Sequence, residues 1–357
     1  METKLSRLPL TKIETWETRK VLKCCAEAHR HLAELKGKAA SIPNEEILIN
    51  TLALQEAKDS SAIENIITTQ DELYREELNI ESHGNAAAKE VRNYVAALKH
   101  GFALVRQSKV IRLEDVLQIQ QIIESNRAGF RKLPGTALKN QRTGEIIYTP
   151  PQHPDEILDL LNNLTAYIND TTLCDADPLV KMAIIHHQFE SIHPFYDGNG
   201  RTGRILNILY LVAHDLLDLP VLYLSRYITQ NKSTYYEELQ NVRITGQWEP
   251  WLLYLVEGIS ITAQHTTQLV EQIKAMMEDF KSKIRTEYPK MYRHELINNL
   301  FNHPYTKIEF LMEDLDVSRL TATKYLDQLV TTGLLKKEKL GRTNYYINQA
   351  LFNLFAG

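Results

Sequence analysis

The sequence predicts a mostly α-helical protein, and three observations support this prediction. Apolar residues recur at the three- and four-residue spacing of helices over long stretches, for example at 16–36 and 248–283. Alternation typical of strands is confined to a few short segments. The chain has 357 residues, more than one small core usually holds, so we expect two or three domains.

Helices are predicted in succession through the N-terminal third. They cover residues 16–36, 44–60, 86–105 and 112–126. Pro43 is expected to open the second helix, because proline is tolerated in a first turn. A short segment at 61–73 separates the second helix from the third.

A β-hairpin is predicted to interrupt the helices. Thr136–Lys139 and Glu145–Thr149 have the character of short strands, and they flank the turn Arg142-Thr143-Gly144. Pro150 and Pro151 end the second strand. Hairpins in helical proteins often carry binding function, and a structural flap is the alternative.

Helices resume at Pro154 and are expected to include one at 225–242. From about residue 290 the pattern changes to shorter elements. Helices are predicted at 294–303, 307–315 and 318–333, with Ser318 as N-cap and Gly333 as C-cap, and strands at 336–339 and 345–347. This order resembles a winged helix-turn-helix domain.

Composition narrows the class of protein. The formal net charge of −4 gives the whole chain no general attraction for nucleic acid or anionic lipid. The odd cysteine count, Cys24, Cys25 and Cys174, argues against a disulfide framework. The chain has no signal-like N-terminus and no run of about 18 apolar residues. We therefore expect a cytoplasmic protein without a membrane segment.

The stretch SIHPFYDGNGRTGRILNILYL, residues 191–211, ends one helix and begins another. His193 is expected at a helix C-terminus, because Pro194 prevents regular continuation. Three glycines allow tight turns and close approach of a ligand to the backbone: Gly198, Gly200 and Gly203. Free N–H groups at the start of the next helix then converge, which predicts an anion site.

Side chains of the same stretch suit phosphate chemistry. Arg201 and Arg204 are one turn apart and can face the same anion, and Asn199 can add a donor. Asp197 beside phosphates suggests a divalent cation, because hard oxygen ligands suit Mg²⁺. His193 can act as a base near neutral pH. Together these residues predict phosphoryl or nucleotidyl transfer.

The segment HPFYDGNGRTGR, residues 193–204, resembles the Fic family signature HPFx[D/E]GN[G/K]RxxR at every specified position. Most Fic proteins with the complete motif transfer AMP from ATP to a hydroxyl side chain of a protein. The resemblance covers roughly residues 40–280 and implies a Fic-type helical bundle with a short β-hairpin flap. Gly200 stands where a branch that phosphorylates its targets has lysine.

The resemblance implies a role for each matching residue. His193 would deprotonate the target hydroxyl, and Asp197 would hold Mg²⁺ on the α- and β-phosphates of ATP. The backbone of the Gly-Asn-Gly turn would form the anion hole. The expected ATP- and phosphate-binding residues are Gly198, Asn199, Gly200, Arg201, Thr202, Gly203 and Arg204, with Arg204 on the γ-phosphate.

The segment SSAIEN, residues 60–65, resembles the family's inhibitory motif [S/T]xxxE[G/N]. Ser60 and Glu64 are four residues apart, so they would share a helix face. The resemblance implies that Glu64 pairs with Arg204, occupies the γ-phosphate site and leaves ATP misplaced. We expect an inhibitory helix at about 58–68, and a solvated helix carboxylate is the alternative for Glu64.

Further assignments follow from the same resemblance. The hairpin would be a flap at 136–150, to whose edge a target segment adds as a strand. Its candidate edge is formed by Glu145, Ile146, Ile147, Tyr148 and Thr149. The candidates on the adenine side are Asn231, Tyr235 and Tyr236, with ordinary packing as the alternative. His186, His187 and Glu190 precede the loop, and we expect packing there rather than a transition-metal site.

The expected organisation is an N-terminal helical region (1–100), a Fic catalytic core (101–285) and a winged helix-turn-helix (290–357). From residue 290 on there are nine Lys and Arg residues against seven Asp and Glu. The weak excess leaves DNA and protein open as partners. The basic candidates are Arg319, Lys324, Lys336, Lys337, Lys339 and Arg342.

The sequence therefore predicts an adenylyltransferase that uses ATP and Mg²⁺ to modify protein hydroxyls and itself, with Glu64 as an inhibitor. A homodimer stays open. One alternative uses the same site to remove AMP or to transfer another nucleotide. The other is a winged-helix DNA-binding regulator whose Fic domain only senses nucleotide.

Overall fold

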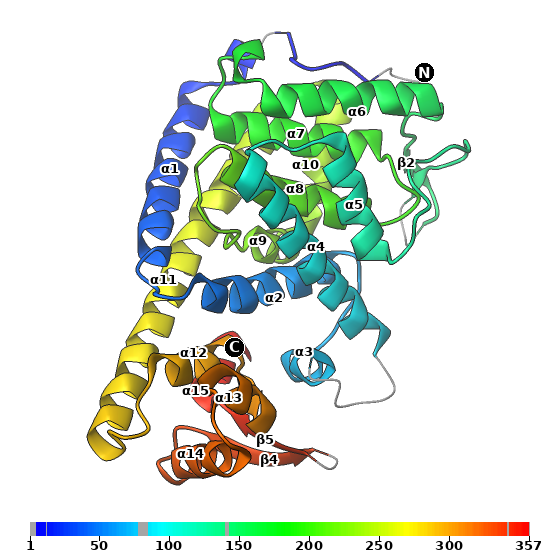
Figure 1. The fold of residues 1–357 in the computed structure, drawn as a ribbon. Helices are drawn as coiled ribbons and strands as arrows, with labels where there is room; N and C mark the ends of the chain where they lie inside the picture. Colours follow the sequence, from blue (N-terminus) through cyan, green and yellow to red (C-terminus); the bar gives the residue numbers. More distant parts are fainter. Residues whose placement is uncertain (1–4, 12, 78–84, 140–142, 341–342, 357) are drawn as a thin grey trace.

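A computed structural model describes residues 5–11, 13–77, 85–139, 143–340 and 343–356. The predicted helical class is confirmed (Figure 1). The elements before the hairpin are a 3₁₀ turn (Ile13–Thr15), α1 (Arg19–Ala39), α2 (Glu45–Ile63), α3 (Gln70–Glu77), α4 (Ala86–Ser108) and α5 (Leu113–Glu124). After the hairpin come α6 (Pro154–Asn169), a 3₁₀ turn (Thr171–Leu173), α7 (Pro178–Ile192), α8 (Asn199–Ala213), α9 (Leu224–Gln230), α10 (Lys232–Thr245) and α11 (Glu249–Glu287).

Helices α7 and α8 form the centre of the molecule. Every residue of α7 from Leu179 to Ile192 is buried, and so is every residue of α8 from Arg201 to Val212. Helices that are buried over their whole circumference have neighbours on all sides. Figure 1 shows α7 and α8 enclosed by the surrounding helices. The loop that joins them, residues 193–198, is therefore held by buried structure at both ends.

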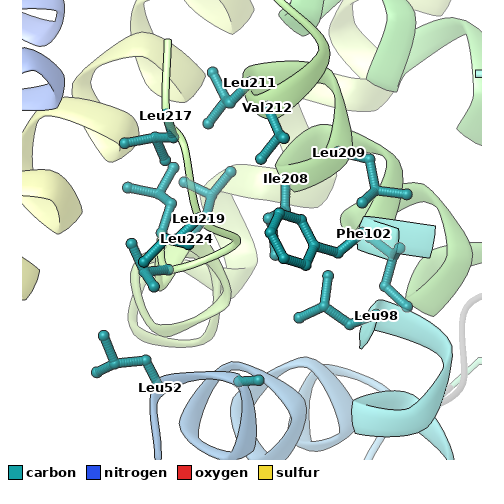
Figure 2. Packing of buried hydrophobic residues seen from close by; sticks show 14 of the residues in the cluster. Leu52, Leu98, Phe102, Ile208, Leu209, Leu211, Val212, Leu217, Leu219 and Leu224 are labelled. Carbon is teal, nitrogen blue, oxygen red and sulfur yellow. The ribbon is translucent and has the colours of Figure 1, made fainter. Parts of the chain in front are cut away.

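Close packing between α4 and α8 fixes the position of α8. A Cβ atom at Gly101 would lie 2.6 Å from Cδ1 of Leu209, so a larger residue there would displace the Leu209 side chain. Figure 2 shows Leu98 and Phe102 of α4 beside Ile208 and Leu209 of α8. Leu52 of α2 reaches the same cluster.

The longest helix, α11, connects the two ends of the fold. Its 39 residues correspond to about 58 Å of helix. Figure 1 shows α1 and α11 side by side, with α11 continuing to the C-terminal elements. The buried apolar cluster is continuous from the central helices into that C-terminal part, where it includes Leu300 and Leu326.

The C-terminal part has the order of elements expected of a winged helix-turn-helix, with additions. It consists of α12 (His294–Asn302), β3 (Tyr305–Lys307), α13 (Ile308–Leu315), α14 (Arg319–Thr331), β4 (Lys336–Leu340), β5 (Thr343–Ile347) and α15 (Gln349–Ala356). The three strands pair antiparallel in the order β3-β5-β4. Ser318 caps α14 as predicted, and Gly333 follows its C-cap with φ +76°. The sequence did not predict β3 and α15.

The predicted hairpin is present but shorter. Strand β1 (Leu138–Lys139) pairs antiparallel with β2 (Ile146–Tyr148). Arg142 of the predicted turn lies outside the described residues, and so does Arg342 of the predicted wing. None of the helices formed by the described residues combines the length and hydropathy that crossing a membrane requires.

Two predicted helices differ at their boundaries. Helix α2 begins at Glu45, one residue after the predicted start, and its N-cap is Asn44, whose side chain accepts a hydrogen bond from the N–H of Glu46 (3.1 Å), so Pro43 lies before the N-cap rather than in the first turn. The stretch predicted as one helix at 225–242 is divided at Asn231 into α9 and α10. The Asn231 side chain donates to the carbonyl of Tyr227 (3.0 Å) at this break.

Candidate active site

The loop between α7 and α8 begins at a strained residue. His193 is the C-cap of α7 and has the left-handed conformation (φ 48°, ψ 58°), which is uncommon outside glycine. Its N–H still donates to the carbonyl of Phe189 (2.9 Å). Phe195 is fully buried, and its ring lies 5.1 Å from that of Phe130. The loop is therefore anchored two residues after the histidine.

Asn199 holds the loop closed. Its side-chain oxygen accepts from the N–H of Phe195 (2.8 Å), and its side-chain nitrogen donates to the carbonyl of Phe195 (2.9 Å). Its side-chain nitrogen keeps a second N–H beyond the one used here, so the donation of this side chain to an anion stays a prediction. Asn199 also offers a ligand its backbone N–H, at the first position of α8.

The N-terminus of α8 presents free backbone donors. Gly198 is its N-cap at φ +79°, and its carbonyl accepts the N–H of Thr202 (2.9 Å). This bond leaves the N–H groups of residues 199–201 without an intrahelical partner. Thr202 and Gly203, which are predicted to bind phosphate, lie in the first turns of α8 and are buried. Gly203 also gives room to α7, where a Cβ atom would lie 2.8 Å from Oε1 of Glu190.

The buried Arg204 and the partly exposed Glu64, whose side chains are 3% and 34% exposed, form an ion pair beside these donors. A guanidinium nitrogen of Arg204 lies 2.8 Å from Oε1 of Glu64. Arg204 also donates to the hydroxyl (2.8 Å) and the carbonyl (2.9 Å) of Ser60. A Cβ atom at Gly200 would lie 2.3 Å from Oε1 of Glu64. The Glu64 carboxylate therefore lies directly against the N-terminus of α8.

Electrostatics keep both partners charged. Burial alone would raise the pKa of Glu64, but the charge and hydrogen bond of Arg204 outweigh it and lower that pKa. Burial likewise opposes the charge of Arg204, and the carboxylate of Glu64 outweighs it, so the pKa of Arg204 is raised. The carboxylate is a negative group at a helix N-terminus, where the helix dipole also favours it.

The segment that carries Glu64 is the end of α2 rather than a helix of its own. Helix α2 ends at Ile63, and Glu64 is its C-cap. Asn65 has the left-handed conformation (φ 64°), the N–H of Ile66 donates to the carbonyl of Ser61 (3.0 Å), and the N–H of Asn65 donates to that of Ala62 (3.0 Å). This is a Schellman motif. The predicted inhibitory helix at 58–68 is therefore corrected.

Arg201 is held by two carboxylates that the sequence analysis missed. Its terminal nitrogens lie 2.7 Å from an oxygen of Glu90 on α4 and 2.7 Å from one of Glu124 on α5. Its side chain is only 5% exposed. The Asp197 carboxylate lies 3.9 Å away. Contacts between residues so far apart in sequence leave no local pattern that would have revealed them.

Asp197 has the character of a Mg²⁺ ligand. Its side chain is 79% exposed, and one oxygen accepts the N–H of Gly198 (2.7 Å). Its other oxygen remains open to solvent at the mouth of the loop. Mg²⁺ is usually held by one or two carboxylates together with substrate phosphates and water, so this donor set fits that ion.

A buried arginine, also missed, fixes the backbone around His193. Arg131 is 1% exposed. Its side chain donates to the carbonyls of His193 (2.7 Å), Pro151 (2.9 Å) and Ile192 (3.3 Å), and its N–H donates to the carbonyl of Pro194 (2.9 Å). Arg131 thus ties the strained residue to the segment that follows the hairpin.

His193 is neutral in this environment. Burial, then the charges of Arg131 and Arg243, lower the pKa of His193 to about 4. A neutral imidazole can accept a proton. The buried Nδ1 has no hydrogen-bond partner among the described residues.

Two buried carboxyl groups lie close to the ion pair. Burial raises the pKa of Glu56 on α2 and of Glu190 on α7 to about 7 in each case. Glu56 accepts from the N–H (2.9 Å) and the hydroxyl of Ser225. Oε1 of Glu190 is buried without a hydrogen-bond partner among the described residues.

The hairpin lies against α7 and α10. The hydroxyl of Tyr148 donates to the carbonyl of Ser191 (2.9 Å), and the guanidinium of Arg243 lies 4.1 Å from the Tyr148 ring centroid. Gln240 donates to the carbonyl of Ile147 (2.9 Å). Of the predicted edge, Glu145, Ile146, Ile147 and Thr149 are exposed, whereas Tyr148 is partly buried.

The adenine-side candidates separate into different environments. Tyr235 is 1% exposed and its hydroxyl bonds Nε2 of His186 (2.8 Å), so this candidate is corrected to a core residue. Tyr236 is 46% exposed and Asn231 is partly buried. His186 and His187 are buried, with ring contacts to Trp251. No group of metal-binding side chains was found among the residues that the structure describes.

Three family models match successive parts of the chain. Residues 22–103 match the Fic/DOC family N-terminal model, and residues 110–211 match the Fic/DOC family model. Residues 276–351 match the C-terminal domain of SoFic-like protein adenylyltransferases. The two Fic/DOC ranges together take in more than half of the sequence.

Curated relatives are similar over part of their length. The chain is 25% identical over 177 residues to protein adenylyltransferase fic-1 of Caenorhabditis elegans, covering 48% of this chain and 33% of that protein. It is 31% identical over 140 residues to a probable protein adenylyltransferase of Aquifex aeolicus, covering 38% and 42%. The chain thus spans about a third of the length of the animal relatives it matches.

Solved structures share the fold. A Fic family protein from Desulfovibrio desulfuricans has a TM-score of 0.58 at 18% identity, covering 92% of this chain and 96% of that one. Fic-1 from C. elegans has a TM-score of 0.54 at 20% identity, covering 70% and 73%. The matched models and this shared fold agree with the loop geometry, and the chain belongs to the Fic/DOC family.

Proposed function

We propose that this chain is a protein adenylyltransferase, which transfers AMP from ATP to a Ser, Thr or Tyr hydroxyl of a target protein and of itself. The observation that carries the proposal is the occupied anion site. The Glu64 carboxylate lies against the N-terminus of α8 and 2.8 Å from Arg204, which supports the proposal that a phosphate of ATP binds at this position. The names of the curated relatives support this choice of reaction.

Different residues of the loop would perform different steps of an in-line transfer of AMP. The target oxygen attacks the α-phosphorus of ATP, the bond to the β-phosphate oxygen breaks, and pyrophosphate leaves. His193 accepts the hydroxyl proton as the new P–O bond forms. The N–H groups of residues 199–201 and the arginines stabilise the negative charge that develops on the phosphate oxygens.

The low pKa of His193 belongs to the state without nucleotide. Two arginine charges contribute to lowering it to about 4. The negative charge of a bound triphosphate would raise this pKa toward the range where a general base is effective. Mg²⁺ bound at Asp197 would neutralise phosphate charge, and it would orient the α- and β-phosphates.

We propose that Glu64 restrains this reaction. It occupies Arg204, which would otherwise bind the γ-phosphate, and it places a negative charge beside the anion site. ATP bound in its presence would have to hold its γ-phosphate elsewhere, so the α-phosphorus would be misaligned for attack. The flap would bind a target backbone along β2, and Tyr236 with Asn231 would border the adenine.

The test is transfer of label from ATP labelled in the α-phosphate, with Mg²⁺. Wild type, Glu64→Gly and Glu64→Gly/His193→Ala would be compared for label on the protein itself and on proteins of a cell lysate. We expect strong label only in Glu64→Gly. Glu46→Gly is the matched control, because it makes the same change on the first turn of α2, far from Arg204.

Other outcomes would redirect the proposal. Absence of label in every variant, despite measurable ATP binding, would contradict AMP transfer. Parallel assays with UTP and GTP would then detect another nucleotide, and a protein already carrying AMP would detect the reverse reaction. Equal label in wild type and Glu64→Gly would contradict the inhibitory role alone.

For the C-terminal part, residues 290–357, we propose a protein partner rather than DNA. Three of its cations are engaged with carboxylates of the same part: Arg319 with Glu309 (2.9 Å), Lys337 with Asp327 (2.7 Å) and Lys336 with Glu338 (3.4 Å). DNA binding relies on cations free to replace counterions at phosphates. A salt-dependent mobility shift with duplex DNA at 50 mM salt would contradict this proposal.

A further inference from the structure

Helix α2 carries a second polar face beside the one that reaches Arg204. Glu56, Ser60 and Glu64 follow one another at four-residue spacing toward α8 and α9. The neighbouring face, with Gln55, Lys58 and Asp59, lines a cavity of about 410 Å³. Residues of α9, α11 and α15 complete its walls. The cavity therefore lies between α2, the helix whose C-cap is Glu64, and the C-terminal helix α15.

The free polar groups of this cavity are donors. Lys58 and Arg226 have no ion pair or hydrogen bond among the described residues, although the Arg226 guanidinium lies 5.9 Å from the Tyr223 ring centroid. Gln55 is 3% exposed, and its buried side-chain nitrogen has no hydrogen-bond partner within the described part of the chain. A buried N–H group without a partner is costly, so this nitrogen requires an acceptor.

Acceptors in the cavity are mostly used. One oxygen of Asp59 accepts the hydroxyl of Tyr223 (2.5 Å), and its backbone carbonyl accepts the hydroxyl of Thr229 (3.2 Å). With Lys58 and Arg226 the cavity keeps an excess of positive charge over Asp59. A ligand that fits must therefore bring acceptor atoms and negative charge.

We propose that this cavity binds a small phosphomonoester, at a site separate from the ATP site. The phosphate group would accept from Lys58, Arg226 and Gln55. A volume of about 410 Å³ leaves room for a small organic body besides the phosphate. The apolar side chains of Leu269 and Phe355 line the same cavity and would contact that body.

The direction of its effect follows from linkage and rests on the proposed function. The cavity is formed by α2 in the position where Glu64 bonds Arg204, because Gln55, Lys58 and Asp59 belong to the same helix. A ligand that binds this arrangement better than one with α2 displaced stabilises it. Binding would therefore strengthen inhibition by Glu64.

Isothermal titration of the full chain tests the site directly. Inorganic phosphate and glycerol 3-phosphate are the probes, which separate the phosphate group alone from a phosphomonoester, and glycerol is the blank. We expect glycerol 3-phosphate to bind wild type and Lys274→Gln, a control that removes an exposed cation elsewhere on α11. Affinity should fall at least tenfold in Lys58→Gln/Arg226→Gln. Equal binding by all three proteins would overturn the site.

A self-labelling assay tests the effect of the ligand on AMP transfer, independently of whether the ligand binds. Glycerol 3-phosphate should lower self-labelling by wild type and leave that of Glu64→Gly unchanged. If glycerol 3-phosphate binds but does not change wild-type labelling, the proposed coupling between the cavity and inhibition by Glu64 is wrong. If no variant transfers AMP but binding still depends on Lys58 and Arg226, the proposed function fails while the site stands.

Discussion

At the scale of single residues, the site depends on charges that are paired over long sequence distances. Arg204 meets Glu64, and Arg201 meets Glu90 and Glu124. Both arginines are thus neutralised in the absence of ATP. Both arginines are almost fully buried, so removing their carboxylate partners would leave a buried positive charge uncompensated.

Arg131 affects His193 in two ways: it holds the backbone of His193 in place, and its charge lowers the pKa of His193. Two substitutions of Arg131 distinguish these effects. Its charge helps to lower the pKa of His193, so removing the charge raises that pKa. His193 must be neutral to accept a proton, so activity is lost as pH falls through this pKa. In the Glu64→Gly background, we expect Arg131→Met to move the acid limb of kcat/KM up by about one pH unit.

Arg131→Lys is the matched control for this prediction. Lysine keeps the charge, but its single compact ammonium lacks the planar fork with which Arg131 reaches these carbonyls from two nitrogens. It should lower kcat without moving the acid limb. A pH profile unchanged in both variants would contradict the electrostatic role of Arg131.

Glu190 predicts a pH dependence of stability. Burial raises its folded-state pKa to about 7, whereas an exposed glutamate has a pKa of about 4.3. Between these values the unfolded chain binds fewer protons, so the free energy of unfolding falls as pH rises from 4.3 to 7. Glu190→Gln removes this contribution, and it should be more stable than wild type at pH 8 by about 3–4 kcal/mol.

Denaturant unfolding at pH 5 and pH 8 measures this difference. Glu27→Gln, on the exposed side of α1, is the control and should follow wild type at both pH values. The prediction fails if the stability of Glu190→Gln parallels that of wild type between the two pH values.

At the scale of elements, the sequence predicted most helices because their periodicity is strong. It failed where tertiary contacts decide. Asn231 divides α9 from α10 without a glycine or proline to mark the break. Tyr235 and Tyr236 are adjacent and chemically alike, yet only their packing shows that one is buried and the other exposed. Arg131 gives no local signal, because all its partners are distant in sequence.

The backbone at the end of α2 explains why the inhibitory motif ends in glycine or asparagine, here Asn65. Asn65 is left-handed, a conformation that glycine and asparagine tolerate and β-branched residues do not. We expect Asn65→Val to destabilise this helix end by about 1–2 kcal/mol and to increase self-labelling, because Glu64 loses its fixed position. Self-labelling and thermal unfolding measure the two effects.

Asn65→Gly provides the comparison. It loses the same side chain, including the oxygen that accepts from Lys232 (3.1 Å), but keeps the backbone conformation. It should therefore label itself as slowly as wild type. Similar labelling by the valine and glycine variants would show that the side chain, and not the helix cap, matters.

At the scale of the whole molecule, the C-terminal part contacts the segment that follows Glu64. Tyr305 of β3 stacks on Tyr74 of α3 with ring centroids 5.5 Å apart, and its hydroxyl donates to Asp71 (2.6 Å). Phe352 of α15 joins this cluster. Helix α3 begins at Gln70, six residues after Glu64. Figure 1 shows α3 between α4 and the C-terminal strands.

From this aromatic contact we predict that the C-terminal part stabilises the position of Glu64, and with it the inhibition of AMP transfer. We expect Tyr74→Ala to increase self-labelling several-fold, to a level below that of Glu64→Gly, because the Arg204–Glu64 bond remains. Tyr305→Ala should have the same effect, and the double variant should add little, since both changes break one contact. Tyr305→Phe keeps the stacked ring and loses only the bond to Asp71, so its effect should be smaller. Hydrogen exchange of residues 60–69 should rise in the same order.

Additive effects of the two alanine substitutions, or increased labelling without faster exchange, would mean that the contact stabilises the C-terminal part without affecting the position of Glu64.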